Sequence, residues 1–184
     1  MRAYGPPAMI RSGLAAVLGT LAIVAVTLLG TGRPAFASDA GMLLPGDPAL
    51  IHLITVEHTL LDLTNSDRVA NGLQPLDFDS DSLIIARQRA ESQLGTPSLS
   101  HYDTDGHLIF ARLLSDANLS FGLAGENLAR ASTDDANVTA RVEQALMQSP
   151  THRKNILERT FKRVAIGAAT DSSGWISFAE VYRD

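Results

Sequence analysis

The apolar residues of this chain change near its C-terminal end from helical spacing to two apolar segments around a turn, and this change limits its possible folds. Over residues 52–70 apolar side chains recur every three or four positions up to Asn71-Gly72, which predicts an amphipathic helix. Asp79 is a suitable cap for a second helix, and Thr133 for a fourth. The helical segments after the first are expected at residues 79–94, 107–117, 133–149 and 151–157.

The last part of the chain predicts a β-hairpin. Two apolar segments, 164–170 and 175–182, flank the turn sequence Asp171-Ser-Ser-Gly174. Helices first and strands last predict an α+β domain, in which helices cover a small antiparallel sheet.

Residues 1–37 have the order that is typical of a secretory signal peptide. They contain three arginines and no acid, an apolar run over residues 13–30, and the exit Ala35-Phe36-Ala37, so cleavage is expected after Ala37. The alternative is a membrane anchor, because 18 apolar residues are just long enough to cross a bilayer. Residues 38–50 predict a short linker, which leaves 51–184 as one domain.

Charge and cysteine content limit which partners the chain can bind and how its fold is stabilised. Without the leader the chain keeps 15 − 3 = 12 basic and 20 acidic residues, a formal charge of −8. Nucleic acid is therefore excluded as a partner, and a membrane is contacted only through an uncleaved N-terminal segment. The chain has no cysteine, so its core must hold the domain without disulfides.

Three polar residues framed by small or apolar neighbours are candidates for chemistry. Glu126 stands between Gly125 and Asn127, which are typical turn residues, so it either pins a turn or faces a cleft as a base or as a partner for histidine. His101 and His152 are either structural residues or ligands for a metal such as zinc. The chain contains neither a His-Glu-x-x-His helix nor a Gly-x-Ser-x-Gly elbow, which argues against the commonest zinc peptidases and serine hydrolases.

Taken in order, these stretches resemble the CAP superfamily of cysteine-rich secretory proteins, antigen 5 and pathogenesis-related proteins, in its cysteine-free bacterial, SCP-like form. The resemblance runs from about Leu60 to Tyr182. Its motifs are Asn65-x-x-Arg68 with Gly72-Leu73-x-Pro75-Leu76, Ser100-His101 with Gly106 and Arg112, Gly125-Glu126-Asn127-Leu128-Ala129, Ser149-Pro150-x-His152-Arg153-x-Asn155-Ile156-Leu157, and Ala179-Glu180-Val181-Tyr182.

The resemblance implies a three-layer α-β-α sandwich, a secreted location and a cleft formed by His101, Glu126 and His152. In some family members such a cleft holds a divalent metal, for which His101 and His152 would be the ligands in this chain. Glu180 would join the pocket if it points inward. The remaining motif residues are expected to hold the fold; they are Asn65, Arg68, Asn127, Arg153 and Asn155.

The chain also departs from the family pattern. Ser149 stands where eukaryotic members have a second acid, Leu146 where a tryptophan is usual, and Glu180 where a glutamine is common. A site with two histidines and two glutamates therefore requires Glu180 to point inward.

These features favour a non-enzymatic secreted binding module. Its ligand would be a divalent metal or a small apolar molecule of the lipid or sterol class, and its partners could include extracellular proteins or peptides. Two alternatives stay open: a metal-dependent extracellular hydrolase or peptidase in which Glu126 handles a proton, and a surface module for adhesion or signalling with a purely structural pocket.

Overall fold

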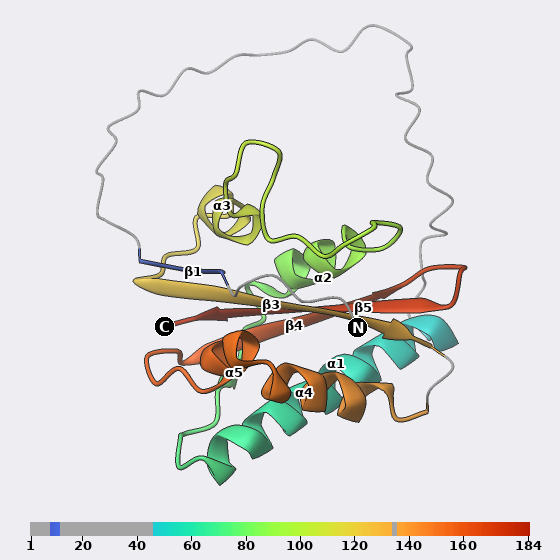
Figure 1. Ribbon diagram of the computed structural model, residues 1–184, viewed down its shortest axis with the longest axis horizontal. Coiled ribbons are helices and arrows are strands. Elements are labelled where there is room, and N and C mark those ends of the chain that lie inside the picture. Colours follow the sequence, from blue (N-terminus) through green and yellow to red (C-terminus); the bar gives the residue numbers. More distant parts are fainter. Residues whose placement is uncertain (1–7, 12–45, 134–135) are drawn as a thin grey trace, which may run out of the picture.

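The chain folds into three layers, in a computed structural model that describes residues 8–11, 46–133 and 136–184. A central sheet carries α2 (Leu83–Glu91) and α3 (Ile109–Asp116) on one face (Figure 1). The other face carries α1 (Pro48–Ala70), α4 (Val138–Gln148) and α5 (Pro150–Ile156). This arrangement confirms the expected three-layer α+β sandwich.

The strands of the sheet follow the order β1-β3-β5-β4-β2. Their bounds are Ala8–Arg11 for β1, Asp77–Phe78 for β2, Leu123–Ser132 for β3, Arg163–Thr170 for β4 and Trp175–Arg183 for β5. The predicted hairpin is confirmed as β4 and β5. The sheet is not wholly antiparallel as expected, because β2 pairs with β4 in parallel. A loop after α1 brings β2 to the sheet, so no hairpin reverses its direction.

Strand β3 corrects the interpretation of Glu126 as a turn residue. Gly125, Glu126 and Asn127 all lie inside this strand, paired with β5 along its length. Glycine at 125 allows close packing, since a Cβ there would come 3.0 Å from the ring of Phe161. On its other side β3 pairs with β1, which belongs to the predicted leader. The apolar run of that leader lies outside the described residues.

Three helices begin four or five residues away from their predicted starts. Helix α1 starts at Pro48, inside the predicted linker, because the side chain of Asp47 caps it by accepting a hydrogen bond from the amide of Ala49 at 2.8 Å. Helix α2 starts at Leu83, since Asp79 pairs with Arg183 instead of capping. Helix α4 starts only at Val138, and residues 134–135 between it and the predicted cap lie outside the described residues.

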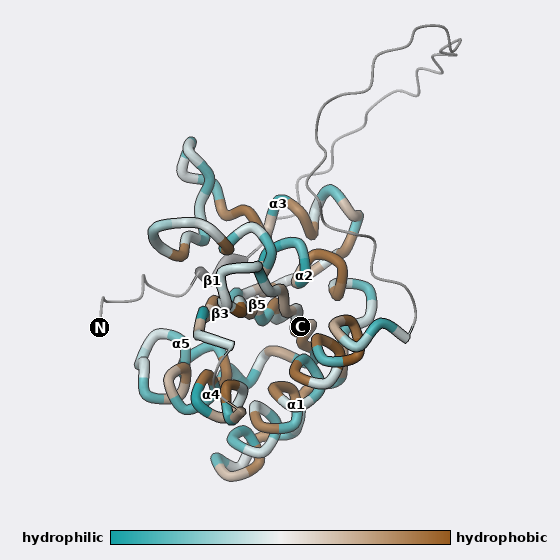
Figure 2. Tube along the Cα trace, turned by 90° about the vertical axis from the view of Figure 1, so that its right-hand side faces the viewer, coloured by the Kyte–Doolittle hydropathy of each residue, from teal (hydrophilic) through white to brown (hydrophobic). Residues whose placement is uncertain are grey.

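The core lies between the helices and the two faces of the sheet. Hydrophobic and hydrophilic residues alternate along α1 and α4 (Figure 2), and their buried apolar side chains include Leu60 and Val142. On the opposite face α2 approaches the sheet so closely that a Cβ on Gly167 would lie 2.2 Å from the backbone of Arg87. Glycine at 167 therefore sets the distance of α2 from the sheet.

Candidate functional site

Glu126 lies in the centre of a buried network on the α2 face of the sheet. Arg89 of α2 donates from Nε to Oε1 at 2.7 Å and from Nη2 to Oε2 at 3.2 Å. The second oxygen also contacts Nδ1 of His101 at 2.7 Å. All three side chains are buried, so neither the carboxylate nor the guanidinium is left without compensation.

Arg89 also fixes the loop that carries His101. Its Nη2 donates to the carbonyl of Ser100 at 2.6 Å and its Nη1 to the hydroxyl of Ser92 at 3.1 Å. The sequence interpretation missed this residue. Its signal was an arginine on the apolar stripe of α2, between Ala86 and Ala90, where it is only 1% exposed.

The contact with Glu126 decides which nitrogen of His101 is available. A carboxylate accepts hydrogen bonds, so we assign the proton of the neutral imidazole to Nδ1, which leaves the lone pair on Nε2. The same carboxylate–histidine pairing orients metal-ligating histidines in proteins.

His152 lies on α5, 2% exposed, and is a neutral imidazole at physiological pH. Burial, and secondly the positive charge of a protonated His101, lower the pKa of His152 to about 4. Asn155 fastens this helix to β3, because its Nδ2 donates to the carbonyl of Glu126 at 3.2 Å and to Oδ1 of Asn127 at 2.9 Å. These bonds tie α5 to β3 at Glu126 and Asn127, while the helix itself lies on the face of the sheet opposite α2 (Figure 1).

Glu180 does not join this group. Successive residues of a strand point to opposite faces, and Glu180 lies opposite Asn127, not Glu126, in the pairing of β3 with β5. Its carboxylate accepts hydrogen bonds from Asn127 at 2.9 Å, Tyr182 at 2.5 Å and Thr64 at 3.2 Å, on the face covered by α1 and α4.

A second acid, Glu143 of α4, is buried on that same face. It is 3% exposed, and Thr64 donates to its Oε2 at 3.1 Å as well as contacting Glu180. Burial, with the negative charge of Glu180, raises the pKa of Glu143 to about 9. Burial also raises the pKa of Glu180, and Glu143 is protonated at neutral pH. The sequence interpretation missed Glu143, although it stands next to Val142 on the buried side of α4.

The other motif residues make mainly backbone contacts. Asn65 binds both the amide and the carbonyl of Leu76, at 2.7 and 3.0 Å. Arg68 donates to the carbonyls of Gln74, Ile156 and Glu158. Arg153 reaches Oδ1 of Asn71 at 3.4 Å. These contacts hold the end of α1 against the loops around it.

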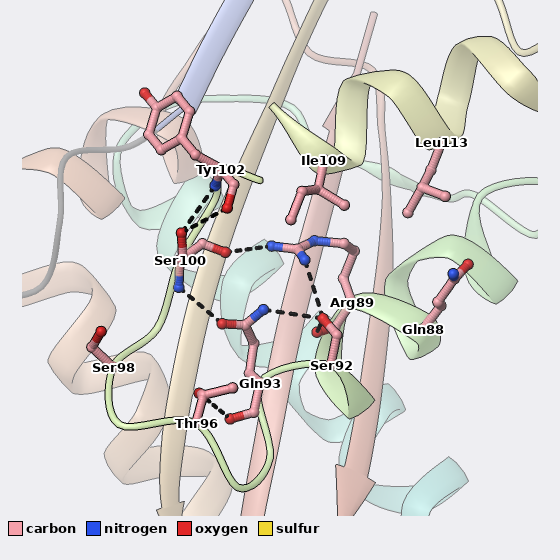
Figure 3. A pocket seen from close by; sticks show the side chains of 10 residues that line it. All are labelled: Gln88, Arg89, Ser92, Gln93, Thr96, Ser98, Ser100, Tyr102, Ile109 and Leu113. Atoms are coloured by element: carbon pink, nitrogen blue, oxygen red, sulfur yellow. Dashed lines mark hydrogen bonds between the residues drawn. The ribbon is translucent and has the colours of Figure 1, made fainter. Parts of the chain in front are cut away.

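A cavity of about 250 Å³ opens beside the network (Figure 3). Arg89 stands in its wall between Ser92 and Ser100, while Ile109 and Leu113 of α3 line another side. Its lining combines hydroxyl and amide groups with an apolar end. The buried ion pair therefore has an open cavity on one side.

The ligand atoms of His101, Glu126 and His152 do not all lie within 4.8 Å of one another among the described residues. Both oxygens of Glu126 already accept hydrogen bonds, so His101 and His152 are the ligands that this group could supply. Among the described residues, one group of three has its ligand atoms within 4.8 Å of one another. It consists of Asp103, Asp105 and His107, which lie in one loop. There Asp103 already accepts the backbone amides of the other two and a hydrogen bond from Arg112.

Comparison with known proteins identifies the family. The sequence pattern of the family described as "CAP: Cysteine-rich secretory protein family" matches residues 61–182, about two thirds of the chain. The chain belongs to the CAP family. The family resemblance expected from the motifs is thus confirmed, and the matched residues include the whole network around Glu126.

Individual relatives agree with this assignment. The chain is 29% identical over 119 residues to the "Uncharacterized protein YkwD" of Bacillus subtilis, covering 65% of this chain and 44% of that protein. Its fold is similar to an extracellular SCP-domain protein from Bacillus anthracis, with a TM-score of 0.61, 25% identity, and 78% and 45% of the two chains covered. It spans under half the length of both relatives.

The fold is also similar to an outer surface protein from Borrelia burgdorferi. The TM-score is 0.61 at 18% identity, with 71% of this CAP domain protein and 92% of the other chain covered. In the part of the chain that the structure describes, no helix is long and apolar enough to cross a membrane.

Proposed function

We propose that this CAP domain is an extracellular, non-enzymatic binding module in which His101 and His152 hold a divalent metal such as zinc. The observation that carries the proposal is the buried contact of 2.7 Å between Glu126 and Nδ1 of His101. It fixes the tautomer whose free Nε2 suits a metal, while burial keeps His152 neutral by lowering its pKa. Zinc prefers neutral imidazole nitrogens among its protein ligands.

The same network argues against catalysis by Glu126. A general base must be free to accept a proton, but both oxygens of this carboxylate are engaged by Arg89 and His101. The bidentate ion pair also keeps the carboxylate in place. Binding therefore agrees with the geometry better than hydrolysis does.

An extracellular location is supported by two independent features. The first 37 residues have the pattern of a signal peptide. Two proteins of similar fold are described as an extracellular protein and an outer surface protein. Cleavage after Ala37 is tested by sequencing the N-terminus of the exported protein.

Zinc titration of the full chain by calorimetry tests the metal site. His101→Ala and His152→Ala are expected to abolish binding, and Glu126→Gln to weaken it about 10- to 100-fold, because the orienting carboxylate is lost. His107→Ala is the matched control, since His107 belongs to the exposed loop cluster. Zinc binding that is lost with His107→Ala and kept with the other variants would refute the proposal.

The cavity of Figure 3 favours a small apolar ligand as a second candidate. Tyr102, Ile109 and Leu113 give it an apolar side, and its volume of about 250 Å³ is close to the lower limit for small-molecule sites. Dodecanoate binding, followed by calorimetry, is expected to disappear in Leu113→Asp and to persist in Ile84→Asp, an exposed site on the same layer. Equal affinity in both variants would exclude this cavity.

A further inference from the structure

A second cavity, of about 300 Å³, shares no lining residue with the first. It is formed where the end of α1 meets the loops that follow α1 and α5 (Figure 1). Arg68 lies in its wall, and Asp77, Arg159 and Lys162 are the other charged residues that line it. Three cationic groups and one anionic group therefore face the same space, in a chain whose formal net charge is −5.

Arg68 is a buried cation without a carboxylate partner among the described residues. Its side chain is 2% exposed, and its hydrogen bonds run from Nε and Nη1 to three backbone carbonyls. Within the described part of the chain, it forms no ion pair with a carboxylate and its Nη2 donates no hydrogen bond. Burial lowers the pKa of Arg68 and outweighs the opposing influence of Tyr182 and Glu158. A buried guanidinium beside an open cavity is a ready partner for an anion.

The rim adds two cations that can move toward a ligand. Arg159 and Lys162 are exposed, and no hydrogen bond or ion pair occupies either side chain in the described structure. Asp77 opposes them, which leaves a formal charge of 3 − 1 = +2 on the lining. The positive potential is therefore local and contrasts with the acidic remainder of the domain.

We propose that this cavity binds the phosphate group of a small soluble phosphomonoester. The free Nη2 of Arg68 would donate a hydrogen bond to one phosphate oxygen at the inner end of the cavity. Arg159 and Lys162 would bind the other oxygens from the rim. Three separate cationic donors suit a tetrahedral dianion with three terminal oxygens better than a planar carboxylate with two. The cavity is larger than one phosphate group requires, so it has room for an organic part.

Calorimetric titration of the full chain with inorganic phosphate and with glycerol 3-phosphate tests this site. Each of Arg159→Gln and Lys162→Gln is expected to weaken binding about five- to tenfold, because one cationic donor is lost. Asp77→Asn is expected to strengthen it about two- to fivefold, because it removes the opposing charge. Arg68 is not substituted, because its hydrogen bonds to three backbone carbonyls also stabilise the fold.

Two controls test whether phosphate binding is specific to this cavity. Lys154→Gln removes an exposed cation outside the cavity and should leave the affinity unchanged. Acetate should bind at least about tenfold more weakly than phosphate. Failure of both phosphate compounds to bind at millimolar concentration, equal affinity for acetate, or equal affinities in the Arg159, Lys162 and Lys154 variants would each overturn the proposal. The measurements are made with a chelator present, so they do not depend on the metal site.

Discussion

Replacing Glu143 by glutamine is expected to stabilise the domain, and to do so more strongly as the pH rises. Burial beside Glu180 raises the pKa of Glu143 from 4.5 to about 9. At pH 7 the folded domain must therefore hold a proton that the unfolded chain releases. This costs about 1.4 kcal/mol for each pH unit above the unfolded pKa, or about 3 kcal/mol at pH 7.

The sign of the pH dependence follows from the direction of the shift. A pKa that is raised by folding contributes stability that is complete below pH 4.5 and is lost as the pH rises through about 9. Glutamine has a similar shape and no proton to release, so the variant lacks this loss. The gain in free energy of unfolding should be near zero at about pH 4.5, about 3 kcal/mol at pH 7, and larger at about pH 8.5.

Urea unfolding followed by circular dichroism measures this gain at the three pH values, on the full chain of both proteins. Glu91→Gln is the matched control, because Glu91 is an exposed glutamate on α2 and its replacement should change stability by less than about 0.5 kcal/mol at every pH. If the curves of wild type and Glu143→Gln shift in parallel with pH, the buried proton is not linked to folding and the reasoning is refuted.

Three further substitutions test the fold by the same unfolding assay. Arg89→Met should cost about 3–5 kcal/mol, because it leaves Glu126 buried and unpaired; a loss below about 1 kcal/mol would show that the ion pair is not what holds the loop. Gly167→Ala should cost about 3 kcal/mol, since its Cβ would lie 2.2 Å from the backbone of α2; an unchanged midpoint contradicts that close approach. Burial favours a higher pKa for Asp79, but its hydrogen bonds to Arg183 outweigh this and lower it, so the stability from Asp79 is present at neutral pH and lost in acid. Asp79→Asn should therefore cost about 3–5 kcal/mol at pH 7 and less at about pH 3, whereas a cost independent of pH would exclude the ion pair as its cause.

Local patterns predicted the helices and the hairpin well, because their information lies in neighbouring residues. The apolar period of residues 52–70 predicts the inward side of α1, and the two apolar segments that flank Asp171–Gly174 predict β4 and β5. Helix starts were less predictable. Asp47 and Asp79 are equally good caps by sequence. However, the Asp79 carboxylate accepts a hydrogen bond from Arg183, which lies 104 residues away in the sequence.

Strand β3 was missed because its residues prefer other local conformations. Gly125 and Asn127 are typical of turns, yet Phe161 and Asn155, more than about 25 residues away, require glycine and an amide in a strand at these positions. Such a preference is weak compared with the burial and pairing that tertiary contacts supply.

The sequence by itself determined the layers, the expected leader and, through its motifs, the CAP family with His101, Glu126 and His152 as its focus. Only the tertiary structure decided how those residues are used. Glu126 pairs with Arg89 on the α2 face of the sheet. Glu180 lies on the opposite face, where Thr64 contacts both it and Glu143. The physical reason is that a buried charge must find its partner across the fold, and sequence spacing does not encode which side chain will be there.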